Sequence, residues 1–240
     1  MDLTVGAVVV AVLAVTMGAT IQGALGFGMN LVTVPVLALA IPDALPATVI
    51  VLGFGVAISV VRHEHHAVDR AGLRWIITGR IPGTVVGALI VATVSTKVLQ
   101  GIVGVIVILL VGASLVMPPL PVTARTQFTA GAVSGVTGTA AGIGGPPMAL
   151  LYQHHPGPTM RSTIGAAFVF GTSLSFLTLA VVGEVSIDQV LLALGLAPFA
   201  LLGSVLGRRF HTLLERGWLR PAVLVFVMLA AATALVDALT

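Results

Sequence analysis

The stretch AAGIGGPPMAL (residues 140–150) sets three glycines and two prolines in the middle of an otherwise apolar segment. Glycine and proline are the poorest helix formers, so an apolar helix is expected to break here. A second such stretch, ALGFGMNLVTV (24–34), lies 116 positions earlier, with Gly26 and Gly28 at the places of Gly142 and Gly144. The pair predicts a duplicated fold with one broken helix in each half.

The composition indicates whether the chain folds in water or in a membrane. Of the 240 residues, 58% are hydrophobic and 8% are charged, and the mean hydropathy is +1.15. A water-soluble surface needs more charge, so the chain is predicted to be an integral membrane protein. We attribute the net charge of +3 to arginines in short loops that determine the orientation of the chain in the membrane. Nucleic acid is therefore not an expected partner. The absence of cysteine excludes thiol catalysis and thiolate metal sites.

Eight apolar blocks follow one another along the chain. Seven are close to the ~20 residues that cross a ~30 Å hydrocarbon core, and the first is about twice as long. They lack the polar alternation of a barrel strand, so the predicted fold class is an all-α polytopic membrane protein. The blocks span residues 3–41, 45–61, 73–94, 98–117, 128–152, 162–182, 190–206 and 219–236.

Matches at the 116-residue shift continue from the first block to the fourth, which is typical of an internal duplication. We interpret the chain as two four-block repeats, residues 1–118 and 119–240, within a single transmembrane domain. Further matched pairs are Gly55 and Gly171, Pro82 and Pro198, and Gly87 and Gly203.

Loop charge indicates how the repeats are oriented. The loop 62–74 carries more arginine than acid, whereas its counterpart 178–190 is acidic and has no base. The basic loop 208–220 contrasts with 92–104, which has a single lysine. Because basic loops stay in the cytoplasm, the two repeats are predicted to be inverted, with both termini on the external side.

Inversion requires one block of each repeat to cross the membrane an even number of times. The Gly-rich first block is the candidate, either as a broken re-entrant hairpin or as two short passes. In the second repeat ~26 residues are available, about 39 Å of helix, which is too short for two full crossings. Re-entry is therefore favoured, with a hairpin and three transmembrane helices in each repeat.

The two breaks are also the predicted substrate site. Non-helical backbone at membrane depth is tolerated where it lines a cavity, and half-helix tips with neutral polar groups suit an anion. Two alternatives stay open, since glycines also serve close helix crossing and hydroxyls also bond back to their own helix. No charged side chain is expected deep inside a block, Arg80 being the nearest. The candidate residues are Thr20, Gln22, Gly26, Gly28, Asn30, Thr137, Thr139, Gly142, Gly144, Gly145 and Pro146.

The segment HEHH (63–66) clusters imidazole and carboxylate groups, which are metal ligands. Its spacing matches no closed four-ligand zinc pattern, so a solvated cytoplasmic loop is favoured, and no metal or cofactor is predicted. A cation or metal transporter that uses this loop is the alternative function. Without cysteine, buried His or Asp, or a Gly-x-Ser-x-Gly elbow, the chain is not expected to be an enzyme.

Two stretches, GALGFGMNLVTVPVLAL (23–39) and SGVTGTAAGIGGPPMALL (134–151), resemble the Gly-rich turns of the sulfite exporter TauE/SafE family, also called the toluene sulfonate uptake permease family. The resemblance implies a bacterial inner-membrane transporter of small sulfur-containing anions such as sulfite or sulfonates. Together with the inverted repeats, it predicts a secondary transporter of these or related organosulfur oxyanions that works by alternating access. It leaves import or export open. The expected partners are a small anionic substrate and the lipid bilayer. A coupling ion, proton or sodium, and a homo-oligomer are left open.

Overall fold

The computed structural model describes residues 4–95 and 120–209, together with 97–99, 101–102, 105–106, 108–109 and 112. Most of the fourth predicted block, the whole eighth block and both chain termini lie outside the described residues. The described residues form helices and no strand. The helices are α1 (Val5–Leu25), α2 (Met29–Ala40), α3 (Ala47–Glu64), α4 (Arg70–Thr93), α6 (Ala124–Ala140), α7 (Gly145–Tyr152), α8 (Gly157–Val181) and α9 (Ile187–Arg209), with 3-10 turns at Pro42–Ala44 and His65–Ala67.

Five of these helices are long and apolar enough to cross a membrane, namely α1, α3 with the turn that follows it, α4, α8 and α9. This confirms the prediction of a polytopic α-helical membrane protein. In contrast, α2 has 12 residues and α7 has 8. At about 1.5 Å per residue, neither reaches across a ~30 Å hydrocarbon core.

Both Gly-rich stretches are places where a helix stops. After α1, Gly26 and Gly28 adopt φ values of 85° and 111°, a left-handed region in which a Cβ atom is strained, and α2 begins at the next residue. After α6, Gly142 adopts φ 71°, and α7 begins at Gly145 with prolines in its first turn. Proline is tolerated there because the first helical N–H groups have no intrahelical partner.

Several other glycines serve helix crossing, the alternative that the sequence left open. In the pair α4 and α6, a Cβ atom on Gly83 would overlap the carbonyl oxygen of Ala132, and one on Gly131 would overlap that of Ile76. In the pair α1 and α9, a Cβ atom on Gly207 would overlap the carbonyl oxygen of Thr20. Small residues therefore let the backbones of both helix pairs touch.

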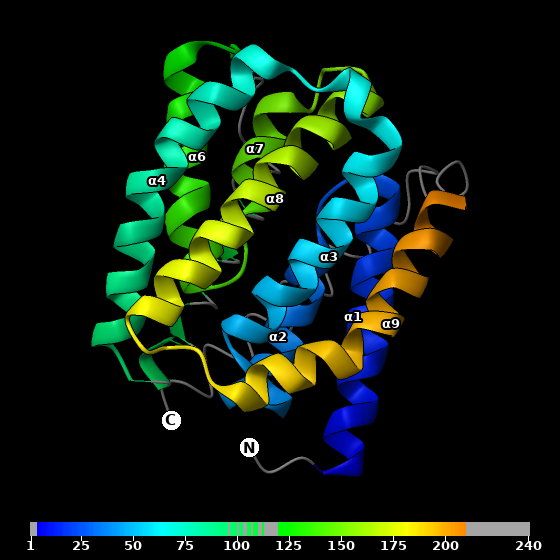
Figure 1. Cartoon of the computed structure of the whole chain (residues 1–240), viewed down its shortest axis with the longest axis vertical. Helices are drawn as coiled ribbons and strands as arrows, with labels where there is room; N and C mark the ends of the chain where they lie inside the picture. The colour runs from blue at the N-terminus through cyan, green and yellow to red at the C-terminus, as the bar shows by residue number, and fades with distance from the viewer. Residues whose placement is uncertain are drawn as a thin grey trace.

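The helices recur in the same order in the two halves of the chain. Shifting α4 by 116 positions gives 186–209, and α9 spans Ile187–Arg209. Shifting α3 gives 163–180, which falls within α8. In Figure 1, α3 and α9 run from the lower end to the upper end, whereas α4 and α8 run in the opposite direction.

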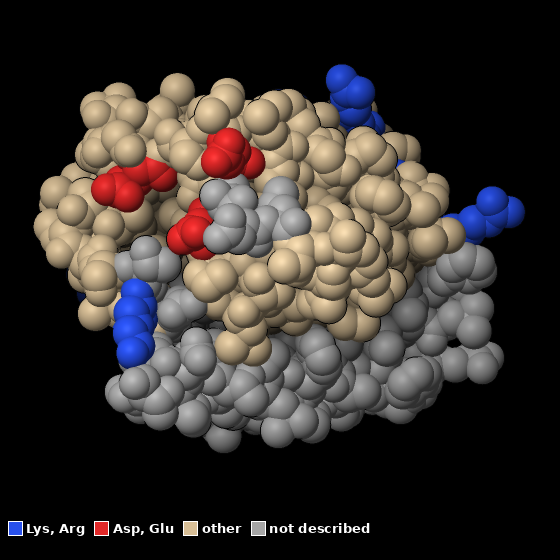
Figure 2. All heavy atoms as spheres, turned by 90° about the horizontal axis from the view of Figure 1, so that it is seen from below, with Lys and Arg blue, Asp and Glu red and all other residues tan. Residues whose placement is uncertain are grey.

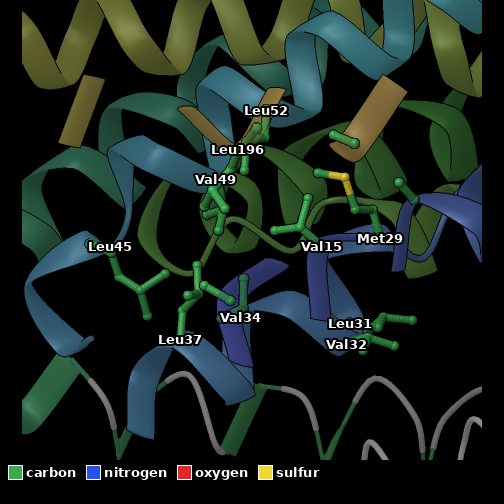
Figure 3. Packing of buried hydrophobic residues seen from close by; sticks show 14 of the residues in the cluster. Val15, Met29, Leu31, Val32, Val34, Leu37, Leu45, Val49, Leu52 and Leu196 are labelled. Atoms are coloured by element: carbon green, nitrogen blue, oxygen red, sulfur yellow. The ribbon is translucent and has the colours of Figure 1, made fainter. Parts of the chain in front are cut away.

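Short helix α2 packs against α1 and α3, and most of its side chains are buried. Its side chains Met29, Val34 and Leu37 are fully buried. They share one apolar cluster with Val15 of α1 and Leu196 of α9 (Figure 3). Burial on these several sides holds α2 in place although it is too short to span the bilayer.

Candidate functional site

A cavity of about 30 Å³ lies between the two helix breaks, with further walls from α3, α4 and α8. One water molecule needs about 10–15 Å³ of such space, so the cavity has room for very few atoms in this conformation. The predicted site residues that line it come from both breaks and are Gln22, Gly28, Asn30, Gly142, Gly144, Gly145 and Pro146.

Arg80 of α4 also lines the cavity, which corrects the expectation that no charged side chain lies deep inside a block. Its side chain is 1% exposed. Nη1 donates a hydrogen bond of 2.6 Å to Ser134 Oγ, and the guanidinium carbon lies 5.9 Å from the centre of the Phe168 ring. Nε has no hydrogen-bond partner, and the described residues that line the cavity include no carboxylate. The site therefore holds a buried cation without a counter-ion among the described residues.

Three glycines make room for the guanidinium group of Arg80. A Cβ atom on Gly171 of α8 would overlap Nε and Cζ, and one on Gly138 would stand 2.9 Å from Nη2. A Cβ atom on Gly144 would stand 3.2 Å from Nη1. Ser134 donates in turn to the carbonyl oxygen of Gly144 at 2.7 Å. Both α8 and the second break are thus shaped around this one cation.

Asn30 joins the two breaks across 112 positions of the chain. Its Nδ2 donates to the carbonyl oxygen of Gly142 at 2.6 Å and to that of Val49 at 3.3 Å. Its Oδ1 is buried and has no hydrogen-bond partner. The amide therefore ties the second break to the first and leaves one acceptor unused.

Gln22 positions the tip of α2. Its Oε1 accepts a hydrogen bond of 3.2 Å from the backbone N–H of Met29, the first residue of α2. This bond satisfies one of the amides that a helix start leaves without an intrahelical partner. At the facing tip, Pro146 and Pro147 have no N–H, so few backbone donors point out of α7. Arg80 is the charged hydrogen-bond donor among the described residues that line the cavity.

Four predicted residues do not line the cavity. Thr20 and Thr137 bond back to carbonyl oxygens of their own helices, at 2.7 and 3.0 Å. Thr139 shares a hydrogen bond of 2.7 Å with Ser175 Oγ of α8. A Cβ atom on Gly26 would meet Cγ, Cβ and Cα of Arg161, so this glycine serves close packing against α8.

A second polar cluster fastens the far end of α7. Tyr152 donates to Asp69 Oδ2 at 2.8 Å and accepts from Gln127 Nε2 at 3.0 Å. Asp69 also caps α4 through the N–H of Gly72, and its own N–H donates to Thr163 of α8. The cluster ties the ends of α4, α6, α7 and α8 together.

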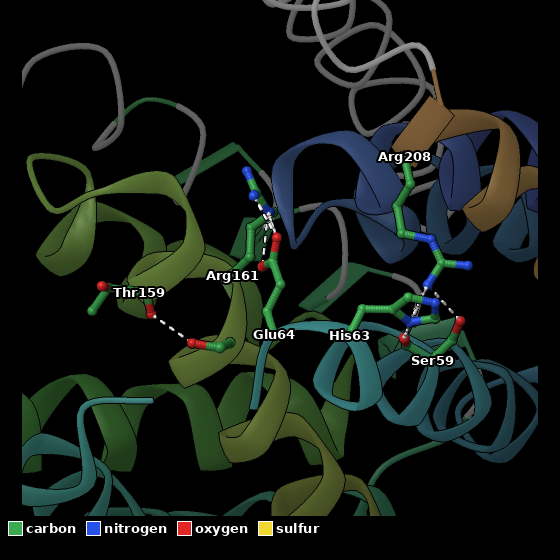
Figure 4. A network of polar contacts seen from close by, with 7 residues as sticks. Ser59, His63, Glu64, Thr159, Arg161 and Arg208 are labelled. Carbon is green, nitrogen blue, oxygen red and sulfur yellow. Dashed lines mark hydrogen bonds and ion pairs between the residues drawn. The ribbon is translucent and has the colours of Figure 1, made fainter. Parts of the chain in front are cut away.

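The HEHH segment forms an ion-paired network rather than a metal centre. Glu64 accepts from Arg161 of α8 at 2.5 and 3.1 Å. His63 and Ser59 contact Arg208 of α9 at 3.0 Å, so both arginines flank the end of α3 (Figure 4). Within the described part of the chain, no three His, Asp or Glu side chains are placed to hold a metal ion.

The sequence model of one family, Sulfite exporter TauE/SafE, matches residues 10–234. The chain belongs to the TauE/SafE family. No curated protein and no solved structure matches the sequence. Membership confirms the resemblance seen in the two Gly-rich stretches, and TauE/SafE proteins are membrane transporters of sulfur anions such as sulfite. A transporter family also agrees with the expectation that the chain is not an enzyme.

Proposed function

We propose that this TauE/SafE protein is a secondary transporter that moves a small sulfur-containing anion, sulfite or a sulfonate, through a site between the two helix breaks. Arg80 is the observation that carries the proposal. A buried cation without a counter-ion is costly and is retained in membrane proteins chiefly for function. An anion in the cavity would neutralise the charge and accept from the unpartnered Nε.

The repeated order of helices in the two halves of the chain supports alternating access by two inverted repeats. Each helix of the pairs α3 and α8, and α4 and α9, runs opposite to its counterpart in Figure 1. The short helices α2 and α7 start beside the cavity, as the half-helices of inverted-repeat transporters do at the bilayer midplane. We infer that each break is the tip of a re-entrant hairpin and that the repeats rock around the two tips.

The distribution of charge supports an orientation in the membrane. The loop between α3 and α4 and the start of α8 lie at the upper end in Figure 1, and the chain at these ends carries Arg62, Arg74 and Arg161. Figure 2 shows acidic side chains on the lower face. Asp43 and Glu184 line one hollow. By the positive-inside rule, the upper end faces the cytoplasm of a bacterial inner membrane, and the N-terminal end of α1 lies outside.

The ion-paired network of Figure 4 stands at this cytoplasmic end and joins α3 of the first repeat to α8 and α9 of the second. A movement that opened the site to the cytoplasm would separate these helices. We infer that Glu64, Arg161 and Arg208 hold the cytoplasmic side closed in this conformation. Glu64 forms an ion pair with Arg161, so nothing observed favours a metal transporter that uses the HEHH loop.

Sulfite flux into proteoliposomes tests the proposal. Arg80→Gln should lower sulfite affinity about 10- to 150-fold, because a hydrogen bond to a charged group contributes about 1.5–3 kcal/mol. The matched control is Arg74→Gln, which removes an exposed arginine from the same helix and should leave flux unchanged. Equal sulfite transport by the Arg80 variant and the control would refute the proposed site, and flux of divalent metals without sulfite would refute the function.

A further inference from the structure

Two buried polar atoms of residues that line the cavity lack hydrogen-bond partners, and they differ in kind. Arg80 Nε is a donor, and Asn30 Oδ1 is an acceptor. The orientation of the Asn30 amide is fixed, because Nδ2 faces the carbonyl oxygens of Gly142 and Val49. A flipped amide would place Oδ1 against two other oxygens, which repel it. The unused acceptor is therefore a property of the site.

The charge of the cavity limits which anions it can hold. Among the described residues that line it, Arg80 is the one charged side chain. A monoanion brings the total to zero, whereas a dianion leaves a net negative charge in surroundings that include Leu31, Ile50 and Phe168. An uncompensated charge away from water is strongly disfavoured. Charge balance alone thus favours an anion with a single charge.

An anion without a proton offers only acceptors. Such an anion satisfies Arg80 Nε but leaves Asn30 Oδ1 either unpaired or facing another oxygen. Leaving a buried acceptor unsatisfied costs more than a hydrogen bond gains. A monoanion that also carries an O–H group satisfies both atoms at once, since one end accepts and the other donates.

We propose that the site selects a monoanion that carries its own hydrogen-bond donor, and that Asn30 Oδ1 accepts the hydrogen bond from this donor. The inference rests on the proposed function, and it identifies the substrate form as hydrogen sulfite rather than the sulfite dianion. The transported proton then travels on the substrate. The described lining has no carboxylate or histidine that would carry it separately.

Two pairs of stable anions test this on the purified full-length protein, with affinity measured by titration calorimetry. Hydroxymethanesulfonate and ethanesulfonate have the same charge and the same number of heavy atoms, and they differ in an O–H against a methyl group. The hydroxyl compound should bind about fivefold tighter or more, the factor that one unsatisfied buried acceptor imposes. Methanesulfonate and sulfate compare one charge with two on tetrahedral anions without a donor, and methanesulfonate should bind tighter.

The variant Asn30→Ala should bind hydroxymethanesulfonate and ethanesulfonate with equal affinity. If this variant is unstable, the comparison of the two sulfonates on the wild-type protein still tests the inference. Equal affinities of the two sulfonates for the wild-type protein, or tighter binding of sulfate than of methanesulfonate, would overturn the inference and leave an anion site in place. Failure of all four anions and of sulfite to bind would instead overturn the proposed function.

Discussion

Gly171→Ala is the most informative substitution, because it acts on Arg80 without changing any polar group. A Cβ atom at Gly171 would lie 2.5 Å from Arg80 Cδ and nearer still to Nε and Cζ, and Cβ atoms essentially never come within 3.0 Å of another atom. Because Nε and Cζ lie nearer to this Cβ atom than Cδ does, the guanidinium group must move further than Cδ to reach an allowed distance. Its bond of 2.6 Å to Ser134 then lengthens or breaks, and Nε moves away from its present position beside Gly171.

The expected loss follows from that displacement. A hydrogen bond between a charged group and an anion contributes about 1.5–3 kcal/mol, so misplacing Arg80 should weaken sulfite binding about 10- to 150-fold. Alanine is otherwise the better helix former by about 1 kcal/mol, so the loss is not one of helix propensity. Calorimetric titration of the purified protein with sulfite measures the change.

The matched control is Gly55→Ala, at the position that corresponds to Gly171 in the first repeat. A Cβ atom there meets nothing within 4 Å, so sulfite affinity should stay at the wild-type value. Sulfite binding by Gly171→Ala as tight as that of the control, or an equal loss of affinity in both variants, would refute the role of Gly171 in placing Arg80.

Three further results are expected. Single cysteines in place of His66 and Ser186, in a chain without native cysteine, should react with an impermeant reagent from opposite sides of the membrane; labelling from one side would contradict the inverted repeats. Gly83→Ala should lower the thermal unfolding temperature, whereas Gly195→Ala, where a Cβ atom meets nothing within 4 Å, should not; equal melting curves would contradict the close crossing of α4 and α6. Tyr152→Phe should lower the free energy of unfolding by about 1–3 kcal/mol through the loss of its buried hydrogen bonds, and an unchanged value in denaturant titration would refute that role.

The helices and their breaks could be predicted from local chemistry. Apolar length and low charge sufficed for α3, α4, α8 and α9, and the Gly-Pro pattern sufficed for the start of α7 at Gly145. The left-handed φ values of Gly26 and Gly142 belong to a region that other residues avoid, which is why glycine marked both breaks.

Arg80 was missed because an arginine near the end of an apolar block usually extends its charged group to the interface. Which way it points depends on the face of α4 that packs inward. The spacing held a usable signal: Gly83 and Gly87 lie three and seven positions after Arg80, on the same helix face, and both contact α6. A face marked by small residues is the buried one.

The contact of Asn30 with Gly142 could not be predicted in detail, because it depends on how two segments 112 positions apart meet. The same holds for Thr20 and Thr137. Their hydroxyl groups face the carbonyl oxygens of the preceding turn, and local sequence does not separate this arrangement from a ligand role.

A structure of the protein with sulfite bound tests the proposed site. The anion should lie between the starts of α2 and α7, within hydrogen-bond distance of Arg80 Nε and Asn30 Oδ1. An anion bound away from Arg80, for example in the hollow lined by Asp43 and Glu184, would contradict it.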